Sequence, residues 1–250
     1  MRHERFFPID AGSIAGERAI LTGPEFHHLV RVVRARVGDE VTLLDGVGGL
    51  YSARVESIGA DEAHLEVIEV SNAGAPPQVD LALPAIKAQR LDLAVEKCTE
   101  IGFNELLLFS SRRSVWRGGE REVERKRERL ERKIISACKQ SGQPFFPRIG
   151  AVTGLEGLLE SIPRYGRVYL ADSRGEAVGE SDGPSKGRKV LAIVGPEGGF
   201  DEGERAGLVA AGAIPVSLGR SRLRSETAAI ILLFAVRSRI EQEIDSGARR

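Results

Sequence analysis

Two glycine-rich segments near the end of the chain carry the residue types best suited to chemistry. The first glycine loop, Val194-Gly195-Pro196-Glu197-Gly198-Gly199-Phe200, follows a strand-like run and leads into a helix-like one, and the second, Leu218–Ala228, does the same. Glycine has no Cβ and tolerates positive φ, so such loops bring bare backbone close to a bound small molecule. An open α/β sheet binds its ligand at the carboxyl ends of neighbouring strands. The two loops therefore predict one small-molecule site.

Several common chemistries do not fit these loops. A P-loop needs Gly-Lys-Ser/Thr at the helix start and a Rossmann fingerprint needs G-x-G-x-x-G after the first strand, and the glycine loops have neither pattern. The four histidines lie in the N-terminal part, and neither Cys98 nor Cys138 belongs to a CxxC pair, which argues against a hydrolase and against a metal site. A nucleoside-containing cofactor that is bound mainly by backbone groups remains.

Length and composition are those of an ordinary globular protein. With 250 residues, 42% of them apolar, the chain can form one large domain or two smaller ones. Met1–Asp10 lacks the apolar core and cleavage site of a secretory signal. The longest apolar run, Ala228–Val236, is well short of a membrane span. We therefore expect a cytoplasmic protein without a membrane segment.

The distribution of charge points to nucleic acid although the formal net charge is zero. Between Arg112 and Arg148 there are twelve basic and five acidic residues, an excess of seven. Within Glu120–Lys133 the charges alternate at i,i+4 spacing, which also fits a solvated helix with internal ion pairs. The arginines before that segment have no acids among them and are better candidates for phosphate contacts. These are Arg112, Arg113 and Arg117.

Two patterns divide the chain near residue 72. Residues 1–72 contain short strand-like runs and one helix, Gly23–Ala35, which favours a small β-barrel. The predicted strands are Arg18–Leu21, Glu40–Leu44, Leu50–Ser57 and Ala63–Val70. Ser71–Pro77 has the composition of a linker. We therefore predict two domains, 1–72 and 73–250.

In 73–250 strands and helices alternate, which predicts a parallel sheet covered on both faces. The predicted strands are Val79–Pro84, Glu105–Phe109, Val168–Ala171, Val190–Val194 and Ile214–Leu218. The predicted helices are Arg90–Ile101, the charged segment, Leu155–Ile162, Asp201–Ala211 and Glu226–Ile240. Because Ala228–Val236 is apolar all round, the last helix should be buried on every side, by the domain core or by a partner subunit.

The paired glycine loops resemble the two cofactor motifs of the SPOUT superfamily, which are S-adenosylmethionine-dependent RNA methyltransferases. Upstream segments at His28–Asp39, Glu96–Gly102 and Ala137–Gly142 are similar to those of the RsmE family, which methylates N3 of one uridine in 16S ribosomal RNA. The resemblance runs from about residue 5 to 240. It implies an α/β fold: an N-terminal PUA-like β-barrel and a C-terminal parallel-sheet SPOUT domain with a deep trefoil knot. It also implies a homodimer.

The resemblance assigns roles to single residues. The expected binding residues for S-adenosylmethionine are Val194, Gly195, Pro196, Glu197, Gly198, Gly199, Leu218, Gly219, Leu223 and Thr227. Arg224 should stabilise the uracil anion, because an arginine stays protonated and can stabilise developing negative charge. Glu226 is a candidate proton acceptor, although an acid at the start of the last helix also favours that helix end. No metal is expected.

The RNA partner is expected to be 16S ribosomal RNA within the small ribosomal subunit, contacted by Arg31, Arg34, Arg112, Arg113 and Arg117. Arg31 and Arg34 fit a solvated helix face equally well. The family usually has Gln-Ser-Gly-Arg where Gln143 follows Gly142 here, so that charge would have to come from Lys139 or Arg148. The general base stays open, and so does the choice between naked RNA and an assembled subunit. The alternatives are a SPOUT enzyme of other specificity and a non-catalytic RNA-binding protein with the same fold.

Overall fold

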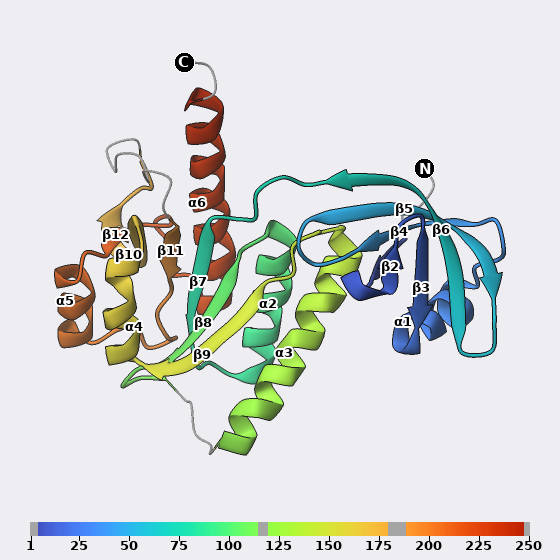
Figure 1. Cartoon of the computed structure of the whole chain (residues 1–250). Helices are drawn as coiled ribbons and strands as arrows, with labels where there is room; N and C mark the ends of the chain where they lie inside the picture. The colour runs from blue at the N-terminus through green and yellow to red at the C-terminus, as the bar shows by residue number, and fades with distance from the viewer. Residues whose placement is uncertain (1–4, 115–119, 180–188, 248–250) are drawn as a thin grey trace. The chain divides into compact units, whose positions relative to one another are not determined.

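The computed structural model describes residues 5–114, 120–179 and 189–247. The chain forms two compact units (Figure 1): one of Met1–Pro76 with Ile135–Phe146, and one of Pro77–Ile134 with Pro147–Arg250. The first unit thus includes 135–146, a segment that the sequence pattern had placed with the α/β part of the chain. The fold class predicted from the sequence, a small β unit followed by an α/β unit, is confirmed.

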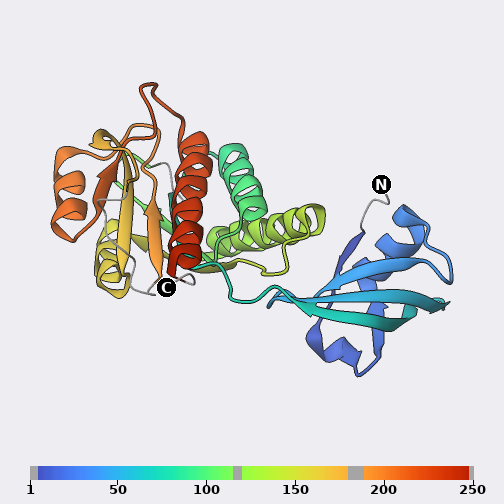
Figure 2. The ribbon, with the colours of Figure 1, turned by 90° about the horizontal axis from the view of Figure 1, so that it is seen from above.

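The first unit is a six-stranded sheet in the order β1-β4-β5-β6-β3-β2, curved into a half-barrel (Figure 2). Its strands are β1 (Phe6–Pro8), β2 (Ile14–Ala15), β3 (Arg18–Thr22), β4 (Glu40–Leu44), β5 (Gly49–Ile58) and β6 (Glu62–Asn72). Only β1 and β4 pair in parallel. All four predicted strands are present; β1 and β2 were missed because runs of two or three residues carry little periodicity. The buried side chains of Phe7, Leu21, Leu43 and Leu65 form the core of this unit.

The helix predicted for Gly23–Ala35 is shorter than expected and irregular. α1 covers Gly23–His27, and a π-helical segment, His28–Val33, continues it. Arg34 then ends the helix in the left-handed conformation, with φ 56° and ψ 42°. A non-glycine residue rarely adopts this conformation, so the end of the helix could not be read from residue type.

The segment 135–146 belongs to the first unit because its aromatic residues lie against the hairpin between β4 and β5. Gly46 and Gly48 in that hairpin have φ of +78° and +114°. A Cβ on Gly46 would lie 2.6 Å from the Phe146 ring, and one on Gly48 would lie 2.6 Å from the Phe145 ring. The backbone also pairs there, since Phe146 N donates to Gly46 O at 2.9 Å. These glycines therefore provide space for the two aromatic rings.

The second unit has a parallel sheet in the order β12-β10-β11-β7-β8-β9. Its strands are β7 (Val79–Pro84), β8 (Glu105–Ser110), β9 (Arg148–Gly154), β10 (Arg167–Glu176), β11 (Val190–Ile193) and β12 (Ile214–Val216). Its helices are α2 (Ala88–Ile101), α3 (Glu120–Ser141), α4 (Leu155–Ser161), α5 (Glu202–Ala210) and α6 (Ser225–Gly247). α2 and α6 cover one face and α4 and α5 the other (Figures 1 and 2), which confirms the predicted covered parallel sheet.

The final helix, α6, is buried by the core on one side only. Ala229, Leu232 and Leu233 are fully buried, whereas Ile231 is 38% and Phe234 62% exposed. The prediction of burial on every side is therefore not met by the chain alone. Among the described residues no helix is long and apolar enough to cross a membrane.

Candidate cofactor site

Residues of β10 and of the loops that follow β11 and β12 line a cavity of about 380 Å³ at the carboxyl edge of the sheet. Eight of the ten residues expected to bind the cofactor line it: Val194, Gly195, Pro196, Glu197, Gly199, Leu218, Gly219 and Leu223. Ser225 and Ala228, which belong to the second glycine loop and to the start of α6, also line it. A volume of this size is typical of sites for small molecules.

The other predicted residues lie around the cavity without lining it. Gly198 faces Arg113: a Cβ added to Gly198 would lie 3.3 Å from Cδ of Arg113. Thr227 is exposed on α6, and so is Arg224, just before the helix. Glu226 is buried, 6% exposed. Helical geometry explains the difference, because successive residues at the start of α6 point in different directions and only Ser225 and Ala228 face the cavity.

Two side chains join the two glycine loops directly. The Ser225 hydroxyl, which is buried, donates to Gly195 O at 2.8 Å. The Arg222 guanidinium donates from Nη2 to Glu197 O at 3.1 Å. The expectation that the two loops form one site is therefore met by direct hydrogen bonds between them.

A third segment, Leu170–Arg174 in β10, also lines the cavity and was missed in the sequence. It forms a polar end: Asp172 makes an ion pair with Arg205, and its Oδ1 accepts from Arg174 N at 2.9 Å. Burial raises the pKa of the Asp172 carboxyl, but these hydrogen bonds and the charge of Arg205 outweigh burial and hold the pKa below its usual value. The signal was present, because Asp172 directly follows the predicted strand 168–171 of the same parallel sheet.

Arg90 is a second residue that the sequence did not single out. It makes an ion pair with Glu197 of the first glycine loop, and its Nε lies 3.9 Å from Oε1 of Glu226. The other oxygen of Glu226 is buried and has no hydrogen-bond partner among the described residues. A cation in the first turn of a helix opposes the helix dipole, and Arg90 occupies that position in α2. The negative charges of Glu197 and Glu226 therefore account for the position of Arg90 in the first turn of α2.

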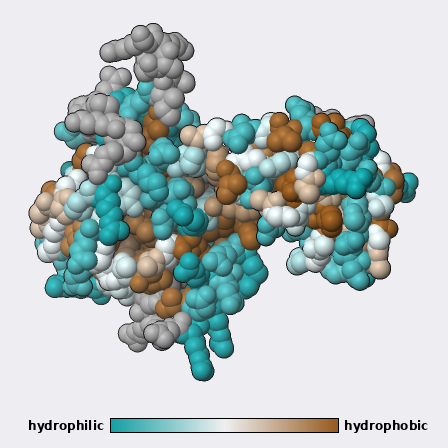
Figure 3. All heavy atoms as spheres, viewed as in Figure 1, coloured by the Kyte–Doolittle hydropathy of each residue, from teal (hydrophilic) through white to brown (hydrophobic). Residues whose placement is uncertain are grey.

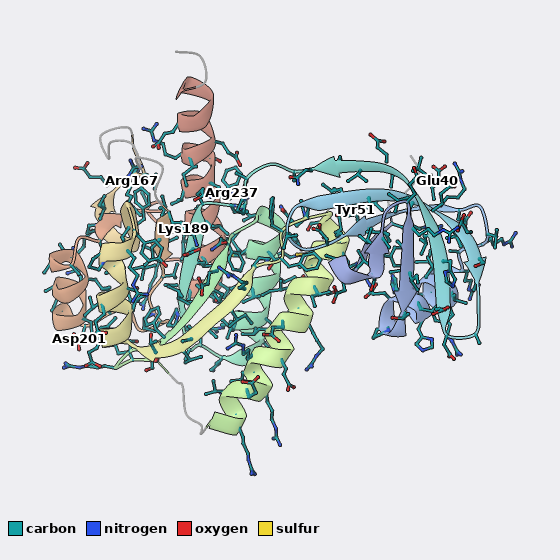
Figure 4. The ribbon with its side chains drawn as sticks, in the orientation of Figure 1. Glu40, Tyr51, Arg167, Lys189, Asp201 and Arg237 are labelled. Atoms are coloured by element: carbon teal, nitrogen blue, oxygen red, sulfur yellow. The ribbon has the colours of Figure 1, made fainter. Side chains whose placement is uncertain are left out.

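The arginines after β8 contact the first glycine loop and α5. Arg113 Nη1 donates to Gly198 O at 2.8 Å. Arg112 Nη1 lies 3.0 Å from Oδ2 of Asp201, which caps α5 and is labelled in Figure 4. Both arginine side chains are exposed. Arg112 and Arg113, both expected to bind RNA, thus lie beside the first glycine loop. Arg117, the third of these arginines, lies outside the described residues.

Comparison with known proteins identifies the family. The family described as "RNA methyltransferase domain" matches residues 74–237, and "RNA methyltransferase PUA domain" matches residues 21–68. Ribosomal RNA small subunit methyltransferase E of Mycobacterium bovis is 32% identical to this chain, over 92% of this chain and 90% of the relative. This chain belongs to the RsmE family of RNA methyltransferases.

Other members of the RsmE family are similar over nearly their whole length. The Bacillus subtilis protein of the same name is 29% identical, over 86% of this chain and 88% of its own. The crystal structure of a ribosomal RNA small subunit methyltransferase E from Neisseria gonorrhoeae bound to S-adenosyl methionine has a TM-score of 0.83. It is 25% identical and the match covers 94% of this chain and 98% of that one.

The basic residues of α3 in this RsmE-family chain are largely paired with acids. Lys126 pairs with Glu122 at 2.8 Å on the same helix, and Arg129 pairs with Asp92 of α2 at 3.2 Å. Figure 3 shows the resulting hydrophilic surface over the N-terminal half of α3. The ion-paired helix that the i,i+4 pattern indicated is therefore present, and the excess of positive charge is smaller than the count of residues suggests.

This RsmE-family chain has Gln143 where the family usually has an arginine, and the candidate replacement Lys139 is already paired with an acid. Lys139 Nζ lies 2.7 Å from Glu25 Oε2 within the first unit. Arg148 is exposed on β9. In the first unit Arg31 and Arg34 are exposed beside Val32, which is 68% exposed.

Proposed function

We propose that this RsmE-family protein methylates N3 of one uridine in 16S ribosomal RNA with S-adenosylmethionine as the methyl donor. That it is an S-adenosylmethionine-dependent ribosomal RNA methyltransferase follows from its family. One observation carries the finer proposal: the two glycine loops meet in one cavity, and Arg224 lies directly beside the wall that Leu223 and Ser225 form. We further expect it to act in the cytoplasm, where its RNA substrate is made.

The cavity fits the chemistry of S-adenosylmethionine. Leu170, Leu218 and Leu223 supply apolar wall for a purine, and Gly195 and Gly199 let the backbone of the first glycine loop approach it closely. The polar end at Asp172 and Arg205 suits hydroxyl, ammonium and carboxylate groups. Bound there, the cofactor supplies an electrophilic methyl group.

Arg224 is proposed to act on the base. Uracil becomes nucleophilic at N3 when that nitrogen loses its proton, and the negative charge then spreads to O2 and O4. A guanidinium beside these oxygens stabilises the anion as it forms, and it remains charged at every relevant pH. The exposure of Arg224 leaves it accessible to an incoming base. Glu226, with one buried oxygen that has no partner among the described residues, is the candidate to accept the proton.

A homodimer is part of the proposal, with α6 in the interface. Thr227, Ile231 and Phe234 are exposed along α6 at helical spacing, so they form one apolar-rich stripe. A stripe that begins beside Arg224 and is covered by a second copy would place the partner next to the site. Substituting Phe234→Glu should shift the mass measured by light scattering from dimer to monomer. A monomeric wild type would exclude this part of the proposal.

The proposed RNA contacts are Arg31 and Arg34 in the first unit and Arg112, Arg113 and Arg117 in the second. Arginine–phosphate contacts release counterions, so removing one lowers the dependence of binding on salt. Arg34→Ala should therefore weaken RNA binding and flatten its salt dependence. An unchanged slope would remove that residue from the phosphate contacts.

The decisive experiment supplies tritiated S-adenosylmethionine together with small-subunit particles or naked 16S RNA, followed by nucleoside analysis. Label in N3-methyluridine from either substrate supports the proposal, and the better substrate shows whether assembly is required. Label in another nucleoside assigns a different specificity on the same fold. Cofactor binding without any transfer would indicate a non-catalytic RNA-binding protein.

A further inference from the structure

The turn at Pro196–Gly199 is held from outside by side chains of other segments. The turn itself is closed by Gly199 N, which donates to Pro196 O at 2.8 Å. The carbonyls of Glu197 and Gly198 then accept from Arg222 at 3.1 Å and Arg113 at 2.8 Å. The first glycine loop is therefore tied to the second loop and to the segment after β8.

Arg113 covers the side of this turn that faces away from the cavity. Glu197 and Gly199 line the cavity, whereas Gly198 between them does not. A Cβ on Gly198 would lie 3.3 Å from Cδ and 3.4 Å from Cβ of Arg113. The turn therefore lies between the cavity and the aliphatic part of the Arg113 side chain.

The position of Arg113 is itself fixed by its neighbours. Ser111 N donates to Ser114 Oγ at 2.8 Å, which closes the turn that contains Arg113. Arg112 N donates to Oε1 of Glu204 at 2.8 Å, and Glu204 is 7% exposed. The guanidinium therefore meets the Gly198 carbonyl from a segment that is already ordered.

We propose that Arg113 is a positioning residue for cofactor binding: its hydrogen bond to Gly198 O holds the first glycine loop in the shape that forms the cavity wall. The physical reason is entropy, because glycine loses more conformational freedom than any other residue when it becomes ordered, and this turn has two adjacent glycines. The proposal rests on the proposed function in one respect, that the cofactor is S-adenosylmethionine.

The charge of the cofactor allows an effect of Arg113 on loop order to be distinguished from a direct electrostatic effect of Arg113 on the cofactor. S-adenosylmethionine carries a sulfonium and is net positive, so removing a nearby arginine would by charge alone leave its binding unchanged or strengthen it. A weaker affinity after loss of Arg113 therefore indicates loss of loop order. A contact of Arg113 with RNA alone would leave cofactor binding without RNA unaffected.

The test is calorimetry of S-adenosylmethionine binding to the full-length protein without RNA. Arg113→Ala should raise the Kd about tenfold, since a hydrogen bond to a charged group is lost. Arg113→Lys should recover most of the affinity, because an ammonium can donate to the same carbonyl. Arg112→Ala is the matched control: it removes the same charge from the same turn but contacts Asp201, and should change the Kd less than about twofold.

Hydrogen exchange supplies a second readout in the free protein. Amides of Gly195 and Glu197–Phe200 should exchange faster in Arg113→Ala, while the thermal midpoint stays within error of the wild type. Wild-type Kd and wild-type exchange in Arg113→Ala would overturn the proposal, and so would equal weakening by Arg112→Ala. If the wild type itself did not bind S-adenosylmethionine, the proposed function would fail instead.

Discussion

The two edges of the parallel sheet in the second unit use polar groups in opposite ways. At the amino edge, polar side chains at the starts of neighbouring strands bond to one another. At the carboxyl edge, backbone groups of glycine loops surround a cavity. Figure 4 places Arg167 and Lys189, which start β10 and precede β11, at one edge and Asp201, after β11, at the other.

The centre of the amino edge is Asp80, which is 2% exposed. Asn104 Nδ2 donates to its Oδ1 at 2.7 Å, and the Tyr165 hydroxyl donates to its Oδ2 at 3.0 Å. Lys189 Nζ lies 3.7 Å from the same carboxylate. Burial first, and then the neighbouring charge of Asp80, raises the pKa of the Tyr165 hydroxyl. The Asp80 carboxylate is therefore satisfied within the chain, and we expect its contacts to serve stability.

The difference shows why polar residues at strand ends do not by themselves indicate a binding site. Where their hydrogen bonds are completed within the chain, they stabilise the fold. Where glycines keep side chains out and the backbone faces a cavity, the backbone can approach a ligand closely. Substitutions at the two edges should therefore affect different measurements.

The largest effect is expected from Arg224→Ala at the carboxyl edge. Loss of a group that stabilises developing charge should lower the single-turnover rate on the order of 10²–10³-fold. The Kd for S-adenosylmethionine should stay near the wild-type value, because Arg224 does not line the cavity. A fall in rate of less than about tenfold would assign Arg224 to phosphate binding or to the dimer interface.

The next effect is expected at the amino edge, from Asp80→Ala. Asn104 and Tyr165 would each lose a buried acceptor, so the free energy of unfolding should fall by about 3 kcal/mol in chemical denaturation. Asp80→Asn keeps one acceptor and should cost less. Cofactor affinity measured well below the unfolding transition should be unchanged. A large loss of cofactor affinity would contradict the conclusion that the amino edge serves stability and the carboxyl edge serves binding.

Gly195→Ala, at the carboxyl edge, should weaken cofactor binding, in contrast to Asp80→Ala at the amino edge. Its Cβ would lie 2.9 Å from the ring of Phe200, which stacks on Phe109. Overpacking of about 2 kcal/mol corresponds to roughly 30-fold weaker cofactor binding in calorimetry. Gly207→Ala in α5 is the control, because its Cβ would make an ordinary contact with Leu159 at 3.8 Å. Equal affinities in the two variants would exclude tight packing at Gly195.

The smallest effect is a pH dependence at the carboxyl edge. The pKa of Asp172 is lowered in the folded protein, so its ionised form contributes stability above the unfolded pKa of about 4. That contribution is lost as the pH falls through the lower folded value. Asp172→Asn should therefore reduce the change in unfolding free energy between about pH 5 and pH 3. Parallel curves for the variant and the wild type would count against the ion pairs at Asp172.

The sequence predicted most of the fold and the two glycine loops of the cavity wall. Alternation of strands and helices gave the parallel sheet, and the glycines located the loops after β11 and β12. The lining segment in β10 was missed because it contains no glycine before Gly175 and continues a strand-like pattern. The contacts of Arg90 and Arg113 with the first glycine loop were also missed, because their partners Glu197 and Gly198 are distant in sequence.

The sequence by itself determined where glycine allows the backbone to approach a ligand, because that property belongs to a residue type and its neighbours. It also determined the apolar patterns that build each unit, and the trefoil knot implied by its resemblance stays a prediction. Only the tertiary structure decided which charges are available and which are paired. Lys139 is held by Glu25, Arg90 by Glu197, and Arg113 by the carbonyl of Gly198. Pairing depends on distances between segments, and those distances exist only once the chain has folded.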